Sequence, residues 1–347
     1  MIEIDGSELE GGGQILRTAV ALSCVTGKPF RIKNIRKGRP QPGLKQQHLV
    51  SLQAAAMLYS ADVKGDRSGS MSVTFAPGEP DPRIMGKTIK IDVGTAGSVT
   101  LVLQTLMPAC LFLPKPVTLE IAGGTHVEWS PPFDYFQRVL VPATRLMGAD
   151  VKSELLSYGF YPKGGGRVRV SVSPCNSLGP IQLAESPRNP QLHATSIASE
   201  HLRKARVAER QLEGAKKILG IAGGSAVYVP SLSPGCCMHI SSISPGHAIG
   251  ASCLGQPGKP AEKVGEAAAL EMKRMLESGA AVDAHLADQF IPYMALAAKN
   301  GTSRILCPEL SSHAETNMWI VKKFLDVEFR TEKKGQTSLI RCFNGGT

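Results

Sequence analysis

A histidine, His313, follows Ser311 and Ser312 at the start of a predicted helix, and Glu315 lies just beyond it. The N-terminal end of a helix disfavours a charged imidazolium, so it keeps a histidine ring neutral and nucleophilic near pH 7. The same helix end attracts phosphate, and a neutral imidazole nitrogen can attack phosphorus. A histidine in this position is also often a capping or packing residue, so the pattern permits nucleophilic catalysis without demonstrating it.

A basic segment from Lys28 to Lys45 contains no acidic residue. Its basic residues are Lys28, Arg31, Lys33, Arg36, Lys37, Arg39 and Lys45. Arg36 and Arg39 lie in a loop punctuated by glycine and proline, where guanidinium groups can converge on a phosphate and bind it bidentately. Gln47 and His48 follow closely. We therefore expect phosphate binding here; the alternative is a solvated basic loop.

A glycine triplet, residues 11–13, opens another predicted helix, so its free amides and the helix dipole could cradle an anion. Glycine could equally be needed there for a tight turn or close packing. Glu10 precedes the triplet and could hold a divalent metal, or could interact only with the helix dipole. Arg17, one turn into the helix on an otherwise apolar surface, requires an anionic partner if it is buried.

Two further polar segments allow more than one interpretation. The stretch His285-Leu286-Ala287-Asp288-Gln289 lies at the start of a predicted helix, where Asp288 could simply be the cap. Basic residues crowd a second helical stretch, which is either a solvated face or an RNA-contacting surface. They are His201, Arg203, Lys204, Arg206, Arg210, Lys216 and Lys217. Phosphate-loop and zinc-hydrolase motifs are absent from the sequence, which disfavours those chemistries.

The composition predicts a globular protein of roughly two domains, because the chain has 347 residues and 42% of them are hydrophobic. Lys and Arg outnumber Asp and Glu by 39 to 29, and this excess favours a polyanionic partner. The sequence shows neither an apolar run of about 20 residues nor a signal-peptide pattern, so we expect a cytoplasmic protein that does not engage a membrane. Eight scattered cysteines without a CxxC pair predict buried thiols in a reducing compartment.

The elements that would position these residues form an internal repeat. In the first copy we predict helices over 14–25 and 44–59 and strands over 29–35 and 70–75. In the second we predict helices over 98–111 and 133–147 and strands over 116–122 and 167–172. A third copy begins near Asp288, with helices over 289–299 and 314–325 and strands over 302–306 and 338–342. One such unit leaves an apolar face that it cannot bury, so three copies packed around a common axis are expected.

Extra sequence between the second and third copies predicts an inserted small α/β domain over residues 183–279. Its predicted helices are 201–219 and 261–278, and its predicted strands are 226–229, 238–243 and 247–253. Residues 1–182 and 280–347 would then form a catalytic domain of three repeats.

Several ordered motifs identify a family that the chain resembles from near residue 2 to its end: the RNA 3′-terminal phosphate cyclases. They are Glu10-Gly11-Gly12-Gly13-Gln14-Ile15-Leu16-Arg17, Ile35-Arg36-Lys37-Gly38-Arg39, Gln47-His48-Leu49, Gly94-Thr95-Ala96-Gly97-Ser98, Gly159-Phe160-Tyr161-Pro162-Lys163-Gly164-Gly165-Gly166, Leu286-Ala287-Asp288-Gln289 and Ser312-His313. The resemblance implies an α+β fold of three two-helix, four-stranded-sheet units around a pseudo-threefold axis, with one small inserted α/β domain.

The resemblance also implies an ATP-dependent reaction in three steps. His313 would take AMP from ATP, with release of pyrophosphate. The AMP would pass to the 3′-phosphate of an RNA, and the neighbouring 2′-hydroxyl would then displace it to leave a 2′,3′-cyclic phosphate. ATP, Mg²⁺ or Mn²⁺, and RNA with a 3′-phosphate end are the implied cofactors and partners, and a homodimer is possible.

By the same resemblance, the ATP pocket would be lined by Gln104, Pro131, His285, Leu286, Ala287, Asp288 and Gln289. Glu10 would lie near the metal. The phosphate and RNA-end contacts would be Arg17, Arg36, Arg39, Gln47 and His48. The chain departs from the family pattern at Tyr158, where Arg or His is common, and at His285, where Tyr is common, so one contact and the stacking on adenine could differ.

Two other functions remain open from the sequence. A relative with the same fold lacks the histidine and serves as an RNA-binding protein in ribosome assembly, but His313 and the Asp288-Gln289 pair are present here. A transferase acting on a small phosphorylated metabolite would fit the repeats and the arginines, but gives His313 no role. We therefore expect the cyclase.

Overall fold

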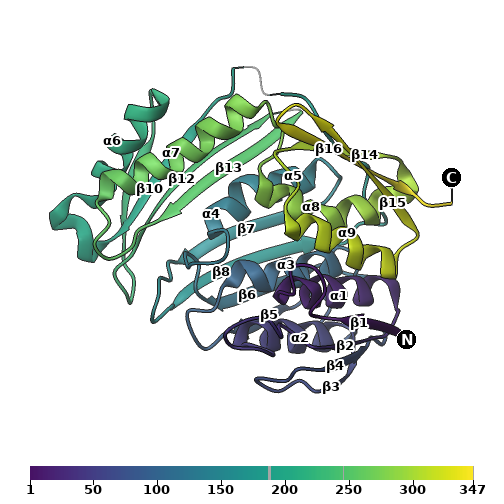
Figure 1. Ribbon diagram of the computed structural model, residues 1–347. Helices are drawn as coiled ribbons and strands as arrows, with labels where there is room; N and C mark the ends of the chain where they lie inside the picture. Colours follow the sequence, from purple (N-terminus) through teal and green to yellow (C-terminus); the bar gives the residue numbers. More distant parts are fainter. Residues whose placement is uncertain (187–188, 245, 347) are drawn as a thin grey trace.

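The computed structural model describes residues 1–186, 189–244 and 246–346. In this part of the chain, helices accompany four sheets of four strands each, so the protein is a mixed α and β structure (Figure 1). Three of these sheets form similar units. The first unit consists of β1 (Ile2–Asp5), α1 (Gly13–Thr26), β2 (Phe30–Lys33), α2 (Gln46–Leu58), β3 (Asp62–Lys64) and β4 (Val73–Ala76).

The second and third units follow the same order of elements. The second contains β5 (Thr88–Asp92), α3 (Val99–Cys110), β6 (Val117–Gly123), a helical segment of α4 (Phe133–Tyr135), the π-helix η1 (Phe136–Leu140) and α5 (Val141–Arg145), then β7 (Asp150–Ser157) and β8 (Gly166–Ser173). The third contains β9 (Gln182–Leu183), α8 (Ala284–Ala297) with the 3₁₀ turn η3 (Ala298–Asn300), β14 (Ser303–Cys307), α9 (Ser312–Phe324), β15 (Val327–Lys334) and β16 (Thr337–Asn344).

Strand pairing is the same in the three units. The strand orders are β1-β2-β4-β3, β5-β6-β8-β7 and β9-β14-β16-β15. In each sheet the first two strands are parallel, and the last strand of the unit runs antiparallel between the second and the third. A parallel pair needs a crossover, and α1, α3 and α8 each lie in the crossover between the first two strands of their unit.

The extra sequence lies between β9 and α8. It contains β10 (His193–Ser199), the 3₁₀ segment η2 (Glu200–Ala205), α6 (Val207–Leu219), β11 (Ser225–Val229), β12 (Cys236–Ser244), β13 (His247–Leu254) and α7 (Ala261–Ser278). The sheet order is β11-β10-β12-β13, and α6 and α7 lie side by side on it (Figure 1). Gly265 permits this close packing, because a Cβ there would lie 1.8 Å from the Gln211 carbonyl oxygen.

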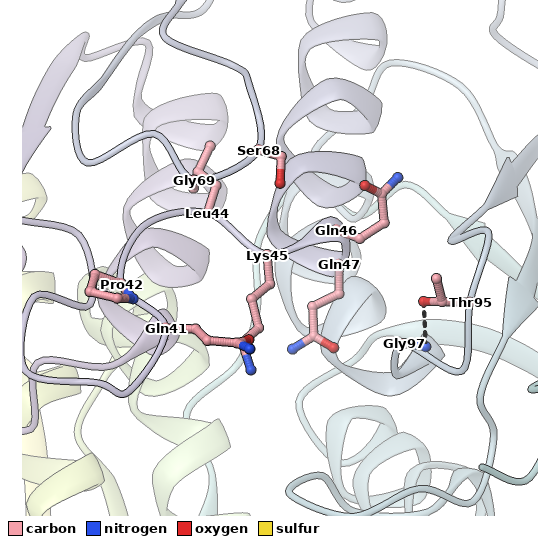
Figure 2. A pocket seen from close by; sticks show the side chains of 10 residues that line it. All are labelled: Gln41, Pro42, Leu44, Lys45, Gln46, Gln47, Ser68, Gly69, Thr95 and Gly97. Atoms are coloured by element: carbon pink, nitrogen blue, oxygen red, sulfur yellow. Dashed lines mark hydrogen bonds between the residues drawn. The ribbon is translucent and has the colours of Figure 1, made fainter. Parts of the chain in front are cut away.

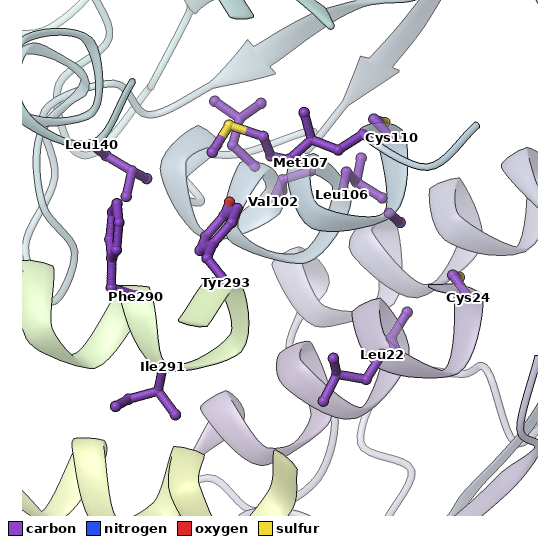
Figure 3. Packing of buried hydrophobic residues seen from close by; sticks show 14 of the residues in the cluster. Leu22, Cys24, Val102, Leu106, Met107, Cys110, Leu140, Phe290, Ile291 and Tyr293 are labelled. Carbon is purple, nitrogen blue, oxygen red and sulfur yellow. The ribbon is translucent and has the colours of Figure 1, made fainter. Parts of the chain in front are cut away.

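The main core is built by helices from different units. Helix α1 packs against α3 and α9, and α8 packs against α9. Figure 3 shows Leu22 of α1, Leu106 and Met107 of α3, and Phe290 and Tyr293 of α8, all buried. Helices α1 and α2 belong to the first unit and α9 to the third. Because this core holds the two units together, it fixes the first turns of these three helices relative to one another.

Some elements differ from the sequence predictions. The third copy, predicted to begin near Asp288, takes its first strand from β9, before the extra sequence, and its first helix begins at Ala284. Asp288 is not the helix cap: the Asp283 carboxylate accepts the Leu286 N–H at 2.9 Å, so Asp288 lies in the second turn. The helix predicted over 201–219 is divided at Arg206, whose φ of 50° interrupts it.

In the described part of the chain, no helix has the length and apolar character needed to cross a membrane. The eight cysteines are free thiols, and all except the half-buried Cys175 and Cys253 are buried, as predicted.

Candidate active site

His313 lies in the first turn of α9, where Ser311 is the N-cap and its hydroxyl accepts the Ala314 N–H at 3.0 Å. The His313 side chain is 47% exposed, so the ring is held by the protein and still reachable by a ligand. Partial burial, followed by the charges of Arg17 and Arg39, lowers the pKa of His313. The ring is therefore neutral at pH 7, which is the protonation state that a nucleophile requires.

Glu10 faces this ring from the loop before α1. Its Oε2 lies 3.7 Å from His313 Nδ1, and its other carboxylate oxygen pairs with the Arg39 guanidinium. The Glu10 N–H donates to Thr316 Oγ1 of α9 at 3.3 Å, which fixes the loop to the histidine helix. Oε2 is buried and has no hydrogen-bond partner in the described structure. A buried carboxylate oxygen without a donor is costly unless a cation or donor group binds it.

The start of α1 adjoins both groups. The Gln14 side-chain amide donates to the His313 carbonyl at 3.2 Å. Gly12 is the N-cap and provides no side-chain cap, so the first turn has amides that no side chain caps. A Cβ on Gly13 would lie 2.2 Å from His48 Nε2 and 3.1 Å from Arg17 Nη1. Glycine at this position therefore lets the predicted phosphate contacts His48 and Arg17 come close to the helix end.

Arg17 has no protein partner at its Nε atom, which is buried. Burial lowers the pKa of Arg17 to about 10, so the guanidinium remains charged at pH 7. A charged group with a buried and unused donor needs an anion nearby, and a phosphate at the α1 N-terminus would provide one.

His48 and Arg36 are both buried, but their side chains make different hydrogen bonds. The Nδ1 atom of His48 accepts the Lys45 N–H at 3.1 Å, which assigns the ring hydrogen to Nε2. Burial and then the neighbouring Arg17, Arg36 and Lys45 charges lower the pKa of His48 to about 3, so its ring is neutral. Arg36 donates through Nη1 to the Gly43 carbonyl at 2.8 Å, which braces the basic loop. Arg39 is the more exposed arginine of this loop.

Gln47, in the first turn of α2, connects the first unit to the second. Its Oε1 accepts the Ser98 N–H at the start of α3, at 3.3 Å. A cavity of about 460 Å³ lies beside it (Figure 2). Figure 2 shows that side chains from the first unit, including Gln41, Lys45 and Gln47, line it together with Thr95 and Gly97 before α3. The lining residues include one cation and no acid, which suits an anionic ligand.

The predicted nucleotide-binding residues come from the second and third units. The Pro131 carbonyl accepts from Thr100 Oγ1 at 2.8 Å, and Gln104 lies one turn further along the same face of α3. The exposed His285 ring meets Tyr135 edge-on, with the ring centroids 6.1 Å apart, and its charge also influences the pKa of His313. Tyr135 follows Pro131 by four residues, so these two contacts bring α3 and α8 to the same segment of the second unit.

The stretch 286–289 is mostly turned inward. Leu286 and Ala287 are buried in the core, so their side chains do not face a ligand. Asp288 is almost fully buried and accepts a short hydrogen bond from Ser311 Oγ, the cap of the histidine helix. Burial raises the pKa of Asp288 to about 6. Gln289 is half-buried, and its side-chain amide donates to the His285 carbonyl at 3.1 Å.

Sequence reasoning missed a polar network beneath His313. Asn317 Nδ2 donates to the Asp288 carbonyl at 2.6 Å, and Asn317 Oδ1 accepts from Thr18 Oγ1 of α1 at 2.8 Å. Thr316 Oγ1 donates to the Ser312 carbonyl and accepts from the Glu10 N–H. The spacing of Asn317, four residues after His313, was the available signal, because it places both near the same side of α9.

For a divalent metal, the described residues contain no cluster of three or more His, Cys, Asp or Glu side chains. Mg²⁺ is often held by one or two carboxylates together with waters and substrate phosphates. Glu10, with its unpartnered Oε2, fits the protein share of such a site.

The amino-acid sequence matches a known protein family, and similar proteins carry the name of that family. Residues 8–331 match the family described as "RTC: RNA 3′-terminal phosphate cyclase". A protein named RNA 3′-terminal phosphate cyclase from Methanosarcina barkeri is 48% identical over 96% of this chain and 97% of its own. Proteins of the same name from Archaeoglobus fulgidus and Pyrococcus furiosus are 43% and 41% identical, over 94% and 98% of this chain and 96% and 99% of their own.

Proposed function

This chain belongs to the RNA 3′-terminal phosphate cyclase family of enzymes, and we propose that it converts the 3′-terminal phosphate of RNA into a 2′,3′-cyclic phosphate at the expense of ATP. The observation that carries this proposal is the half-exposed His313 at the N-terminus of α9, between the charges of Arg17, Arg39 and Glu10. A phosphate-binding helix end, a neutral imidazole and two arginines are what nucleotidyl transfer needs.

In the first step, His313 attacks the α-phosphorus of ATP. Its Nδ1 faces Glu10, so Nε2 is the nitrogen available for attack. A nitrogen–phosphorus bond forms while the bond from the α-phosphorus to the bridging oxygen breaks, and pyrophosphate leaves with the electron pair. Arg17 and Arg39 stabilise the negative charge that develops on the phosphoryl oxygens. The uncapped first turn of α1 adds backbone N–H donors directed toward the same region.

In the second step, an oxygen of the RNA 3′-phosphate attacks the phosphorus of the adenylylated histidine. The nitrogen–phosphorus bond breaks, His313 is regenerated neutral, and an RNA–adenylate anhydride forms. In the third step, the adjacent 2′-hydroxyl attacks the RNA phosphorus, loses its proton and expels AMP. Activation is necessary because a phosphate dianion has no adequate leaving group for ring closure. Arg39, Gln47 and His48 would hold the RNA end during both steps.

A divalent cation, Mg²⁺ or Mn²⁺, is part of the proposal, and Glu10 is the residue that would hold it. When bound, such an ion offsets the charge of the triphosphate. Glu10 would offer the ion its Oε2 atom, which has no hydrogen-bond partner. Arg39 pairs with Glu10 through Nη2, so its other N–H donors are available for phosphate. Gln104, Pro131, His285, Asp288 and Gln289 would surround the adenosine, with Leu286 and Ala287 shaping the helix from the core side. We further propose that the three units are repeats about a pseudo-threefold axis, which their common strand order supports.

The test uses the full chain, ATP, Mg²⁺ and a short RNA carrying a 3′-phosphate. Formation of an end that resists phosphatase, only when ATP is present, is the expected result for the unaltered protein. His313→Ala should abolish it, whereas His193→Ala, at an exposed histidine of the extra domain, should not. Cyclisation without ATP, or full activity of His313→Ala, would contradict the proposal. RNA binding without any turnover would favour an RNA-binding role in assembly.

A further inference from the structure

Trp129 is 93% exposed, which is unusual for the largest apolar side chain. Its φ of 65° is a backbone conformation that residues other than glycine rarely adopt. Hydrogen bonds nevertheless hold the surrounding loop, residues 124–132 (the Trp129 loop), in place. Ser130 Oγ donates to the Val127 carbonyl at 3.2 Å, and Gln256, which follows β13 in the extra sequence, donates to Glu128 Oε1 at 2.8 Å. Strained conformations that a structure holds in place often occur where ligands bind.

A second exposed aromatic side chain lies on the neighbouring loop. Tyr161 is 75% exposed, and its loop, residues 158–166, hydrogen-bonds to the Trp129 loop through Thr125 N–H and His126 N–H, which both donate to the Gly159 carbonyl. Lys163, which is exposed, adds positive charge to this loop, whereas Arg167 lies beyond it in β8 and pairs with Glu120 at 3.5 Å. The two loops therefore combine exposed rings with a cation, although Glu128 also lies among them.

Both loops pack against residues 94–97, of which Thr95 and Gly97 line the cavity in Figure 2. A Cβ on Gly124 would lie 2.4 Å from the Ala96 carbonyl oxygen, and one on Gly164 would lie 2.8 Å from the Thr95 carbonyl oxygen. Residues 94–97 are thus packed backbone to backbone against the aromatic loops. Thr95 and Gly97 also line the cavity together with Gln47. Residues 94–97 therefore connect the cavity to both aromatic loops.

We propose that Trp129 and Tyr161 form a stacking platform for the bases of single-stranded RNA upstream of its 3′-terminal nucleotide. The inference rests on the proposed function, because it takes the RNA end to lie near Arg39 and Gln47. Exposed aromatic rings beside cations are the pattern by which proteins hold single strands without reading their sequence. The strand would run from the arginines past the cavity and across residues 94–97 to the two rings.

The experiment compares 3′-phosphorylated RNAs of two and ten nucleotides by fluorescence anisotropy with the full chain. Trp129→Ala should weaken binding of the ten-nucleotide RNA about tenfold, as expected for loss of one stacked base, and that of the dinucleotide less than twofold. Trp129→Phe should retain most of the affinity, and Tyr161→Ala should show the same dependence on length. Leu146→Ala, at another exposed apolar residue, is the matched control and should change neither.

Trp129 can also report directly, because Trp319 is the only other tryptophan in the sequence. In a Trp319→Phe variant, the ten-nucleotide RNA should quench the remaining emission and the dinucleotide should not. Equal effects on both RNAs, or no effect on either, would overturn the platform. Loss of nucleotide transfer from ATP to the protein in Trp129→Ala would also overturn it, and would assign the ring to adenine.

Failure of the platform and failure of the proposed function are distinguishable. Length-dependent loss of binding in Trp129→Ala, in a protein that forms no cyclic phosphate, would leave the platform standing and remove the function. Normal cyclisation of every RNA length by Trp129→Ala would support the proposed function and overturn the platform.

Discussion

Gly13→Ala tests the geometry of the site through a single methyl group. A Cβ at Gly13 would lie 2.2 Å from His48 Nε2, whereas an ordinary contact begins at 3.4 Å, so one group must move by about 1.2 Å. His48 cannot yield easily, because its ring is buried and its Nδ1 accepts the Lys45 N–H. A displacement of about 1 Å at a positioned group costs on the order of a hundredfold in rate. We expect that loss in kcat/KM for RNA with a 3′-phosphate.

The stability of the same variant separates two opposing effects. Alanine is a better helix residue than glycine by about 1 kcal/mol, whereas overpacking costs about 1–3 kcal/mol, so a net loss of up to about 2 kcal/mol is expected in denaturant unfolding. Gly38→Ala is the matched control, because a Cβ there meets no atom within 4 Å. The double variant Gly13→Ala/His48→Ala should be less destabilised than the sum of the single changes. Unaltered activity and stability of Gly13→Ala would refute the close contact between α1 and His48.

Three other predictions concern charge and burial. Arg39→Ala should reduce cyclisation of RNA at least tenfold. It should change the free energy of unfolding by less than about 1 kcal/mol, because the Arg39 side chain is 43% exposed. A large fall in Tm would instead assign Arg39 a structural role. Asp283→Ala should cost about 2–4 kcal/mol in denaturant unfolding, because the Tyr135 hydroxyl and the Gly250 and Leu286 N–H groups lose their acceptor; an unchanged Tm would contradict this. Burial lowers the pKa of His239 to about 4. Between about pH 6.5 and pH 4, the unfolded chain therefore binds a proton on this histidine and the folded protein does not. Stability should therefore fall as the pH decreases from 6.5 toward 4, and His239→Gln should make Tm less dependent on pH over that range.

The helices were predictable because their apolar residues recur at helical spacing, as in the amphipathic α7, or because the segment is largely apolar, as in α1. Helix α7 has the bounds predicted for it, and α1 differs by one residue at each end. Strands β7 and β15 carry many charges and were missed, and β15 is mostly exposed along its length. Strand β10, which has small and polar residues and no acidic, Lys or Arg side chain, was missed as well. Their partners in the sheet determine them, and pairing between distant segments leaves little local signal. The two-residue strand β9 is fixed by β14, more than 100 residues later.

For the site, the sequence indicated the residue types and the helix ends but not the contacts. The N-terminal position of His313 followed from Ser311 and the polar start of α9. The approach of Glu10 to His313, and the closeness of His48 to Gly13, depend on the packing of α9, α1 and α2, which belong to two different units. The Asp288, Asn317 and Thr18 network likewise joins three helices and could not be found along one segment.

In the proposed reaction, a neutral His313 receives the nucleotidyl group of ATP. Incubation of the full chain with ATP labelled at the α-phosphate and Mg²⁺, followed by peptide mass spectrometry, tests it directly. We expect AMP attached to the peptide that contains His313, in a bond that acid cleaves and alkali does not, and no such adduct in His313→Ala. A labelled adduct that persists in His313→Ala, or one located on another residue of the unaltered protein, would show that His313 is not the nucleophile.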